Sequence, residues 1–232
     1  MRELDAKTIT ENVAQMCKEA AYYLPDDVYA ALKRGRETEK SPVGQNVLDQ
    51  IIKNAEIAKN EDRPYCQDTG FTIVFLEVGQ DLHIVGGDLE QAVNDGIAKG
   101  YTDGYLRKSV VSEPLFNRVN TGNNTPGAIY TKIVPGDKLK ITVEPKGFGS
   151  ENKGGIKMLV PADGVEGVKK AVMDIILHAS MNPCPPTVIG IGIGGTTTCL
   201  GVNIEWGPTH IAGLPVAVTI CCHACRHKTR TL

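Results

Sequence analysis

The spacing of apolar residues changes once along this chain, near residue 70, and this change restricts the possible folds more than any other feature. Before it, apolar residues recur at intervals of three and four, as at Ile9, Val13 and Met16, which predicts amphipathic helices. After it, residues 71–78 are rich in β-branched and aromatic side chains, which predicts a strand. We therefore expect an α/β fold with mixed α and β elements, in which N-terminal helices precede mixed sheets with covering helices.

Three helices are expected in the first sixty residues. The first carries an apolar face that runs from Ile9 to Ala20. Asp26 can cap a second, short helix that ends near Gly35. The pair Ser41-Pro42 is typical of a helix start and predicts the third helix.

The rest of the chain is expected to mix strands and helices. Residues 128–134, the turn at 135–137 and the alternating apolar residues from Leu139 predict a β-hairpin. Asp88 is expected to open a helix, and residues 164–179 form another whose inward face is Val165, Val168, Val172 and Ile176. Short strands are expected at residues 156–160, 187–191, 200–204 and 215–220. No repeat or linker is visible, so we expect a single domain over residues 1–232.

Charge and hydropathy exclude two classes of partner from our expectations. The 25 Lys and Arg against 27 Asp and Glu leave a net charge of -2, whereas a surface that neutralises nucleic-acid phosphates is expected to be basic. The longest apolar run, residues 188–195, falls far short of the ~20 residues that span a bilayer. Residues 1–5 show no secretion signal. We therefore expect neither nucleic acid nor a membrane as partner, and a cytoplasmic location.

The cysteines are the first sign of chemistry. In a reducing compartment disulfides are improbable, so thiols outside the core become candidates for metal binding or catalysis. Cys17 lies on the apolar face of the first helix and is expected to be a buried spectator. The seven cysteines are at positions 17, 66, 184, 199, 221, 222 and 225.

A glycine-rich run at residues 188–195 matches the spacing Gly-x-Gly-x-x-Gly but does not indicate a dinucleotide site. That motif needs a helix opening at its last glycine and an acidic residue about 20 positions further on. Here β-branched residues follow Gly195, and the nearest acidic residue, Glu205, comes too early. We therefore do not expect a nucleotide cofactor.

Three cysteines are predicted to lie in loops where a thiolate can face a cleft: Cys66, Cys184 and Cys222. Three single thiolates from separate loops suit an iron–sulfur cluster better than a structural zinc site, whose ligands usually come in close pairs. A cluster held by three protein ligands leaves one metal open as a Lewis acid. Three alternatives stay open at this point, namely a zinc site, a redox pair and inert thiols, the first two built from Cys221, Cys222, His223 and Cys225.

Two polar loops, residues 120–126 and 146–155, have the amides, lysines and glycines that can hold carboxylates. Ordinary turn chemistry is the alternative for both loops. Arg107 could be a surface charge or an anion contact, and His210 a proton donor or a structural histidine.

Taken together and in order, five segments resemble the α subunit of class I, iron–sulfur fumarate hydratase. The L-tartrate dehydratase α subunit is a close relative that shares the cysteine loops, but Gly149-Ser150-Glu151-Asn152 looks like the fumarase version, which favours fumarate and malate as substrates. The segments are Cys66–Gly70, Asn120–Pro126, Lys146–Asn152, Asn182–Pro186 and His210–Pro215.

The resemblance implies a hydro-lyase that hydrates fumarate reversibly to L-malate. It implies that Cys66, Cys184 and Cys222 hold a 4Fe–4S cluster with one iron open to substrate, and that His210 and Asp68 are catalytic. It also implies a small dicarboxylate substrate and a hetero-oligomer in which a β subunit supplies the remaining active-site residues. The residues implied to bind substrate are Gln67, Asp68, Arg107, Gly149, Asn152 and Lys153.

One stretch departs from the family pattern. The family normally has several tens of residues between the segments that match residues 192–196 and 200–205, and here these segments abut. We therefore expect an internal deletion near residues 195–199. The competing hypothesis is a truncated, non-catalytic homologue that acts as a scaffold or as a zinc or thiol module.

Overall fold

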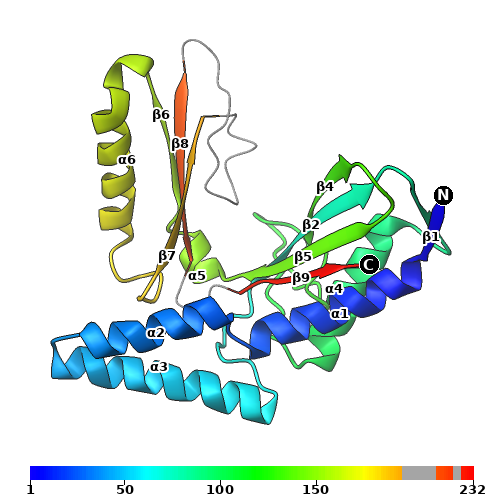
Figure 1. The fold of residues 1–232 in the computed structure, drawn as a ribbon, viewed down its shortest axis with the longest axis horizontal. Helices are drawn as coiled ribbons and strands as arrows, with labels where there is room; N and C mark the ends of the chain where they lie inside the picture. The colour runs from blue at the N-terminus through cyan, green and yellow to red at the C-terminus, as the bar shows by residue number, and fades with distance from the viewer. Residues whose placement is uncertain (195–212, 222–225) are drawn as a thin grey trace. The chain divides into compact units, whose positions relative to one another are not determined.

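The computed structural model describes residues 1–194, 213–221 and 226–232 (Figure 1). It confirms the expected mixture of α and β elements. The chain divides into two compact units, the first made of residues 1–146 and 226–232 and the second of residues 147–225. Within the described ranges, no helix combines the length and the hydropathy needed to cross a bilayer. The single hydro-lyase domain expected over residues 1–232 stays a prediction.

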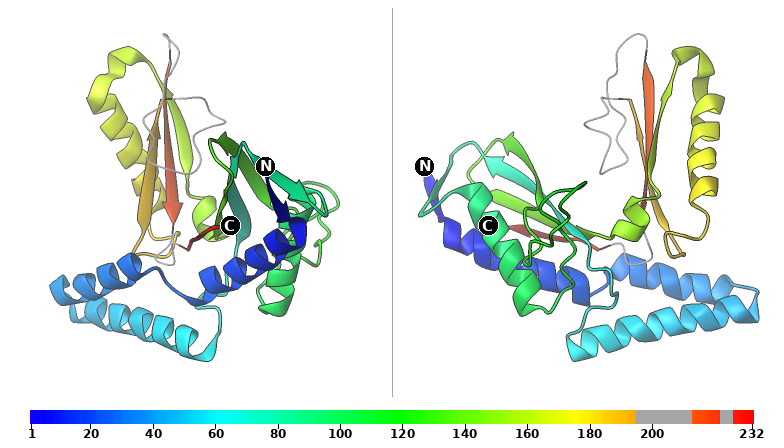
Figure 2. Two further views of the ribbon diagram at one scale, coloured as in Figure 1. Left: turned by 45° about the vertical axis from the view of Figure 1, so that its right-hand side comes forward. Right: turned by 180° about the vertical axis from the view of Figure 1, so that it is seen from behind.

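Two helices of the first unit, α1 (Ala6–Tyr22) and α4 (Leu89–Asp103), pack against each other (Figure 2). Each begins at an aspartate that accepts a backbone N–H: Asp5 from Lys7 at 2.8 Å, and Asp88 from Gln91 at 2.8 Å. The expected opening of a helix at Asp88 is therefore confirmed. The close approach of the two helices depends on Gly100, where a Cβ atom would lie 2.7 Å from the Ala14 carbonyl oxygen.

Helices α2 (Asp26–Thr38) and α3 (Pro42–Glu61) form a helical hairpin. The Ser41 hydroxyl accepts the Gly44 N–H at 3.4 Å at the start of α3, as the Ser41-Pro42 pair predicts. Arg36 and Asp49 join the two helices through an ion pair of 2.9 Å. The three N-terminal helices are confirmed, and α2 continues one turn beyond the end expected near Gly35.

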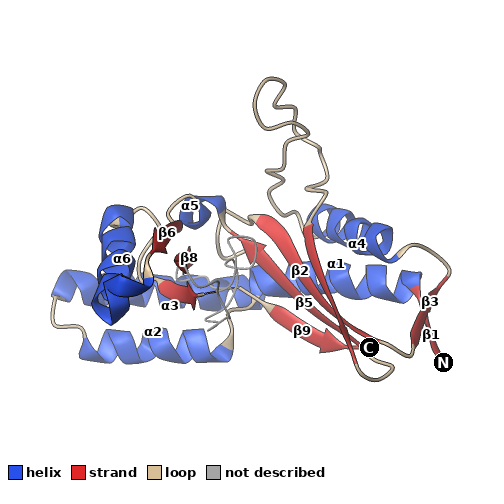
Figure 3. Cartoon of the chain, turned by 90° about the horizontal axis from the view of Figure 1, so that it is seen from above, coloured by secondary structure: helices blue, strands red, loops and turns tan. Residues whose placement is uncertain are grey.

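A four-stranded sheet with the order β4-β2-β5-β9 completes the first unit, and Figure 3 shows β2, β5 and β9 side by side. The strands are β2 (Phe71–Gly79), β4 (Ala128–Val134), β5 (Leu139–Lys146) and β9 (Lys228–Thr231). One face of the sheet is buried in the core that α1 and α4 share. The strand residues buried in this core are Val74, Leu76, Leu139, Ile141 and Val143.

The predicted hairpin between residues 128–134 and the strand from Leu139 is wrong. β4 pairs with β2 in parallel and β5 pairs with β2 in antiparallel register, so β2 separates the two strands. The connection at 135–138 spans about 10 Å, two strand spacings, and passes over the end of β2. It is fixed there by bonds from the Gly79 N–H to the Lys138 carbonyl at 2.8 Å and from the Asp81 N–H to the Gly136 carbonyl at 2.9 Å. This central place in the sheet buries Val74 and Leu76 of β2.

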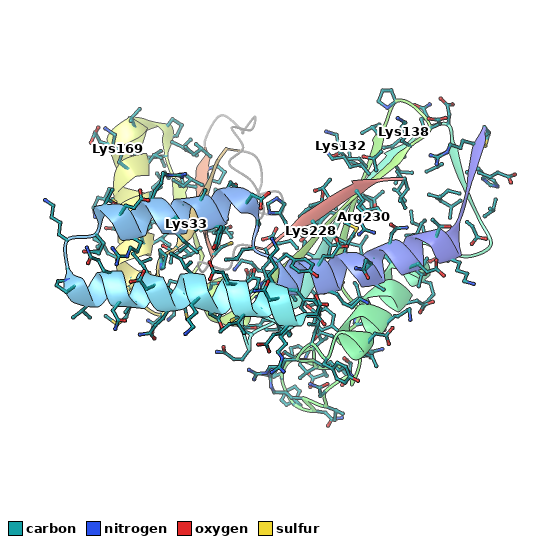
Figure 4. The ribbon with its side chains drawn as sticks, turned by 60° about the horizontal axis from the view of Figure 1, so that its bottom comes forward. Lys33, Lys132, Lys138, Lys169, Lys228 and Arg230 are labelled. Carbon is teal, nitrogen blue, oxygen red and sulfur yellow. The ribbon has the colours of Figure 1, made fainter. Side chains whose placement is uncertain are left out.

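Three short strands have no counterpart in our predictions. β1 (Arg2–Asp5) pairs in parallel with β3 (Leu82–Val85), and β9 pairs with β5. β9 reads Lys-Thr-Arg-Thr and has no apolar residue to indicate a strand. It is held to α1 by Arg230, whose guanidinium donates to Glu19 Oε1 at 2.6 Å and to Asn12 Oδ1 at 2.9 Å (Figure 4).

The second unit is an antiparallel sheet with the order β6-β8-β7, covered on one face by α6. Its elements are α5 (Phe148–Glu151), β6 (Gly155–Leu159), α6 (Gly164–Ala179), β7 (Val188–Ile193) and β8 (Leu214–Cys221). The predicted helix and three of the predicted strands are confirmed, while the strand expected at 200–204 lies outside the described residues. Val165 is 68% exposed, against the prediction, because it lies in the first turn of α6, before the residues that enter the core.

Candidate functional site

The segment Cys66–Gly70 connects α3 to β2 in the first unit. Its exposure changes along its length: Gln67 is exposed, Cys66 and Asp68 are half-buried, and Thr69 and Gly70 are buried. The Gly70 N–H donates to Asp68 Oδ1 at 3.1 Å, which closes a tight turn, and Gly70 has a φ of 72° that a residue with a Cβ rarely adopts. The turn therefore leaves Gln67 accessible while its other end is anchored in the protein.

Three consecutive backbone carbonyls of this segment each accept a hydrogen bond from a buried side chain. Arg226 Nη2 donates to the Asp68 carbonyl at 2.5 Å, and the Tyr101 hydroxyl donates to the Thr69 carbonyl at 2.6 Å. Asn124 Nδ2 donates to the Gly70 carbonyl at 3.1 Å. The exposed fractions of the three donor residues are 3% for Arg226 and 0% for Tyr101 and Asn124. We call Arg226, Tyr101 and Asn124 the carbonyl clamp.

The same segment is bonded to the stretch that begins at Arg107. The Thr69 hydroxyl donates to the Arg107 carbonyl at 2.8 Å. Asn124 Oδ1 accepts the N–H groups of Ser109 at 2.8 Å and Val110 at 3.2 Å, while its Nδ2 donates to the turn. The Arg107 side chain is exposed. Asp68 and Arg107, both predicted to contact substrate, thus belong to two segments that are bonded to each other.

Our sequence reasoning missed the roles of the carbonyl clamp. Asn124 falls in the asparagine-rich loop that could receive an anion or form ordinary turns. The structure shows that its side-chain amide is hydrogen-bonded to backbone groups. The sequence signal for a structural role is the residue type, because asparagine adopts a left-handed φ more readily than most residues, and Asn124 has a φ of 64°. Tyr101 and Arg226 carry no such signal, since a hydrogen bond to a carbonyl leaves no motif.

Other predicted substrate contacts lie in the second unit. Gly149 and Asn152 are exposed at α5, and Lys153 is half-buried directly after it. The Lys153 N–H donates to the Ser150 carbonyl at 3.1 Å, and the Asn152 N–H to the Phe148 carbonyl at 3.1 Å, so the backbone turns tightly here. A cavity of about 390 Å³ adjoins this turn and is lined by Glu151, Gly154, Gly155, Ile156 and residues 217–220.

The predicted cluster ligands are described only in part. Cys66 Sγ lies 3.7 Å from Gln67 Oε1 in the first unit. Cys184 is exposed in the second unit, in the loop between α6 and β7, with a left-handed φ of 58°. Cys222 and His210 lie outside the described residues. Within the described part of the chain, no group of three His, Cys, Asp or Glu side chains is arranged to hold a metal ion. The three-cysteine set stays a prediction.

Two other cysteines lie in regular secondary structure, Cys17 in a helix and Cys221 in a strand. Cys17 is fully buried in α1, as expected, and burial raises the pKa of its thiol to about 12. Such a thiol stays protonated near neutral pH and is a poor nucleophile and a poor metal ligand. Cys221 is half-buried at the end of β8. His223 and Cys225, which belong to the zinc or redox alternative, lie outside the described residues, as does Cys199.

The glycine-rich run at residues 188–195 begins as a strand. Residues 188–193 form β7, which pairs with β8 along its whole length, so Gly190 and Gly192 lie inside a sheet. In a dinucleotide site the corresponding glycines form the loop between a strand and a helix. The described part of the run, residues 188–194, thus has a strand where that motif has a loop, and the absence of a nucleotide cofactor stays a prediction.

Comparison with known proteins defines the class of the chain. The model of the fumarate hydratase (Fumerase) family matches residues 10–197 and 192–231. A protein of Methanocaldococcus jannaschii named "Putative L(+)-tartrate dehydratase subunit alpha" is 40% identical over 196 residues, which cover 81% of this chain and 67% of that protein. The L(+)-tartrate dehydratase subunit alpha of Escherichia coli K12 is 33% identical over 189 residues, which cover 80% of this chain and 61% of that protein.

The chain is thus related to dehydratase subunits, and it belongs to the fumarate hydratase (Fumerase) family. Its alignments span about three fifths to two thirds of the length of these relatives. The family model matches in two pieces that overlap at residues 192–197, next to the place where the sequence predicts a shortened segment.

Proposed function

We propose that this chain is the α subunit of an iron–sulfur hydro-lyase that hydrates fumarate reversibly to L-malate. Membership of the fumarate hydratase family supports the reaction class. The observation that carries the proposal is the anchored turn at Cys66–Gly70, which keeps Gln67 exposed and is bonded to the Arg107 segment. Reacting groups need such fixed placement, because small displacements of a bound substrate lower the rate steeply.

In this proposal Cys66, Cys184 and Cys222 hold a 4Fe–4S cluster. Thiolates are the ligands that such clusters use, and Cys66 and Cys184 are loop residues that are not fully buried. When bound, the cluster supplies an open iron that acts as a Lewis acid on the C–O bond. Cys17 is unsuited to this task, because its buried thiol has a raised pKa.

The remaining residues would bind and orient a dicarboxylate. The cationic Arg107 and Lys153 would hold carboxylates through charge-assisted hydrogen bonds. Asp68 and His210 would act on the proton that is moved during the reaction. The other contacts with substrate would come from Gln67, Gly149 and Asn152.

A second subunit is part of the proposal. The relatives carry the designation "subunit alpha", which implies that they work with a further chain. We infer a hetero-oligomer in which a β subunit supplies the remaining active-site residues. A reducing compartment such as the cytoplasm would suit a cluster that depends on thiolates.

L-Tartrate is the alternative substrate. The two relatives described above are named as L(+)-tartrate dehydratase α subunits, one of them putative, which favours a dihydroxy diacid. The segment Gly149–Asn152 looks like the fumarase version and favours fumarate. Hydration of fumarate and dehydration of L-tartrate, measured on the same preparation, decide between these substrates.

The test uses the chain purified without oxygen together with its β subunit and reconstituted with iron and sulfide. We expect iron to be retained, a broad iron–sulfur absorbance and loss of fumarate. Cys66→Ser is expected to lose iron, while the matched variant Cys17→Ala keeps it. A native complex without iron would favour the non-catalytic scaffold, and zinc that survives substitution of Cys66 and Cys184 would favour the zinc module.

A further inference from the structure

We propose that the carbonyl clamp is a set of positioning residues that fixes the turn bearing Gln67 and Asp68 relative to Arg107 and so determines how tightly a dicarboxylate binds. The proposal rests on the proposed function, because the segments it joins are those that would contact substrate. None of the clamp residues needs to touch substrate. Their effect would pass through the backbone that they hold.

The clamp acts on carbonyls that face inward. In the turn, the carbonyl oxygens of residues 68–70 accept from Arg226, Tyr101 and Asn124 in that order. Arg226 lies two positions before β9, Tyr101 lies in α4 and Asn124 lies in the loop before β4. Three elements that are distant in sequence therefore fix three successive peptide groups. A turn fixed in this way holds in one place the backbone from which the Asp68 side chain projects, directly after Gln67.

Asn124 is the residue that joins the two segments. Its Nδ2 donates to the Gly70 carbonyl, and its Oδ1 accepts the N–H groups of Ser109 and Val110. The bond from the Thr69 hydroxyl to the Arg107 carbonyl joins the same two segments a second time. Since Asn124 is fully buried, removing its side chain takes away the protein partner of one buried carbonyl and two N–H groups, which costs free energy.

Tyr101 and Arg226 also hold the turn, through their bonds to the Thr69 and Asp68 carbonyls. Burial raises the pKa of the Tyr101 hydroxyl, so it remains a donor at any pH at which the enzyme would work. Arg226 packs against the Tyr65 ring, with its guanidinium carbon 5.8 Å from the ring centre. Arg226 also follows Cys222 by only four positions.

The first arm of the test measures hydrogen exchange on the full chain. Asn124→Gly removes both the Nδ2 donor and the Oδ1 acceptor, and glycine readily adopts the left-handed backbone of this position. Asn124→Asp keeps the acceptor and removes the donor. We expect exchange at Ser109 and Val110 to be about tenfold faster in Asn124→Gly and close to native in Asn124→Asp. Both variants should speed exchange at residues 68–70. Native exchange at all these amides in Asn124→Gly would overturn the proposal.

The second arm measures kinetics on the assembled enzyme. Tyr101→Phe removes one hydroxyl from the clamp, and Tyr22→Phe is its matched control, because the Tyr22 hydroxyl donates to the Gly104 carbonyl at 2.9 Å, away from the turn. We expect a KM for fumarate raised about tenfold in Tyr101→Phe, with iron content unchanged, and a native KM in Tyr22→Phe. A lower melting temperature with a native KM would make Tyr101 merely structural and overturn the proposal.

The two arms separate the clamp from the proposed function. If the native complex hydrates no substrate, the proposed function fails, and hydrogen exchange alone then decides whether Asn124 joins the two segments. If the native complex is active, the proposal requires both faster exchange in Asn124→Gly and a raised KM in Tyr101→Phe.

Discussion

Gly100 of α4 lies directly against Cys17 of α1, so closely that a Cβ atom at Gly100 would be 2.9 Å from the Cys17 Cβ. The next residue, Tyr101, is fully buried and donates its hydroxyl to the Thr69 carbonyl. The packing of two helices thus determines the position of a hydroxyl at the candidate site. A side chain in place of Gly100 would therefore disturb both the core and the turn.

Gly100→Ala is expected to lower the free energy of unfolding by about 1–3 kcal/mol, because the added methyl group meets the Ala14 backbone, which cannot move aside as a flexible side chain can. Gly35→Ala in α2 is the matched control, since nothing lies within 4 Å of a Cβ atom there. That change should stabilise the chain by roughly 0.5–1 kcal/mol. Urea unfolding of both variants measures the difference, and equal effects would contradict the packing argument.

Alkaline pH is expected to destabilise the chain through Cys17. Burial raises the pKa of this thiol from 9.0 to about 12, so above pH 9 the unfolded chain loses the proton while the folded chain keeps it. Stability from this group is complete below pH 9 and is lost as pH rises toward 12, by up to about 1.4 kcal/mol per pH unit. Unfolding curves at several pH values should show a shallower alkaline loss for Cys17→Ala than for the native chain. Identical slopes would refute the assignment to Cys17.

Arg230→Ala is expected to weaken the attachment of β9 to α1 and to lower the free energy of unfolding by about 1 kcal/mol. The Arg230 side chain is 33% exposed and its partner Glu19 is 24% exposed, so water screens the pair only in part. Arg230→Lys should recover part of the loss, because an ammonium group cannot reproduce the two-pronged contact with Glu19 and Asn12. Full recovery by lysine would show that charge alone accounts for the contribution of Arg230 to the attachment of β9 to α1.

Arg107→Ala is expected to raise the KM for fumarate by roughly tenfold or more, the loss that a charge-assisted contact worth about 1.5–3 kcal/mol predicts. Lys132→Ala is the control, because Lys132 is an exposed cation on β4. Steady-state kinetics of the assembled complex measure both variants. A native KM in Arg107→Ala would return this residue to the role of a surface charge.

The elements that the sequence predicted well are those with a local physical cause. Ser41 and Asp88 cap helices through their own side chains, and the strand from Phe71 has its own run of β-branched and aromatic residues. Pairing partners depend on residues far away in sequence. For this reason the hairpin prediction failed, and β9, whose side chains are polar, was missed.

The candidate site divides in the same way. The turn at Cys66–Gly70 and the Arg107 segment were identified through the family resemblance, and the structure bonds them to each other. The donors that hold them were not predicted, because Tyr101 and Arg226 act on backbone carbonyls, which every residue possesses. Only tertiary structure determines which carbonyl a buried hydroxyl or guanidinium meets.

The second unit is an insertion between two neighbouring strands of the first. β5 ends at Lys146, the chain returns at Arg226, and Lys228 of β9 pairs with Val143 of β5. Topologically, residues 147–225 are thus the very long loop of a β5–β9 hairpin. Residues can be gained or lost within such a loop without shifting the register at its base. The shortened stretch predicted near 195–199 would therefore leave the sheet of the first unit and the turn at Cys66–Gly70 intact.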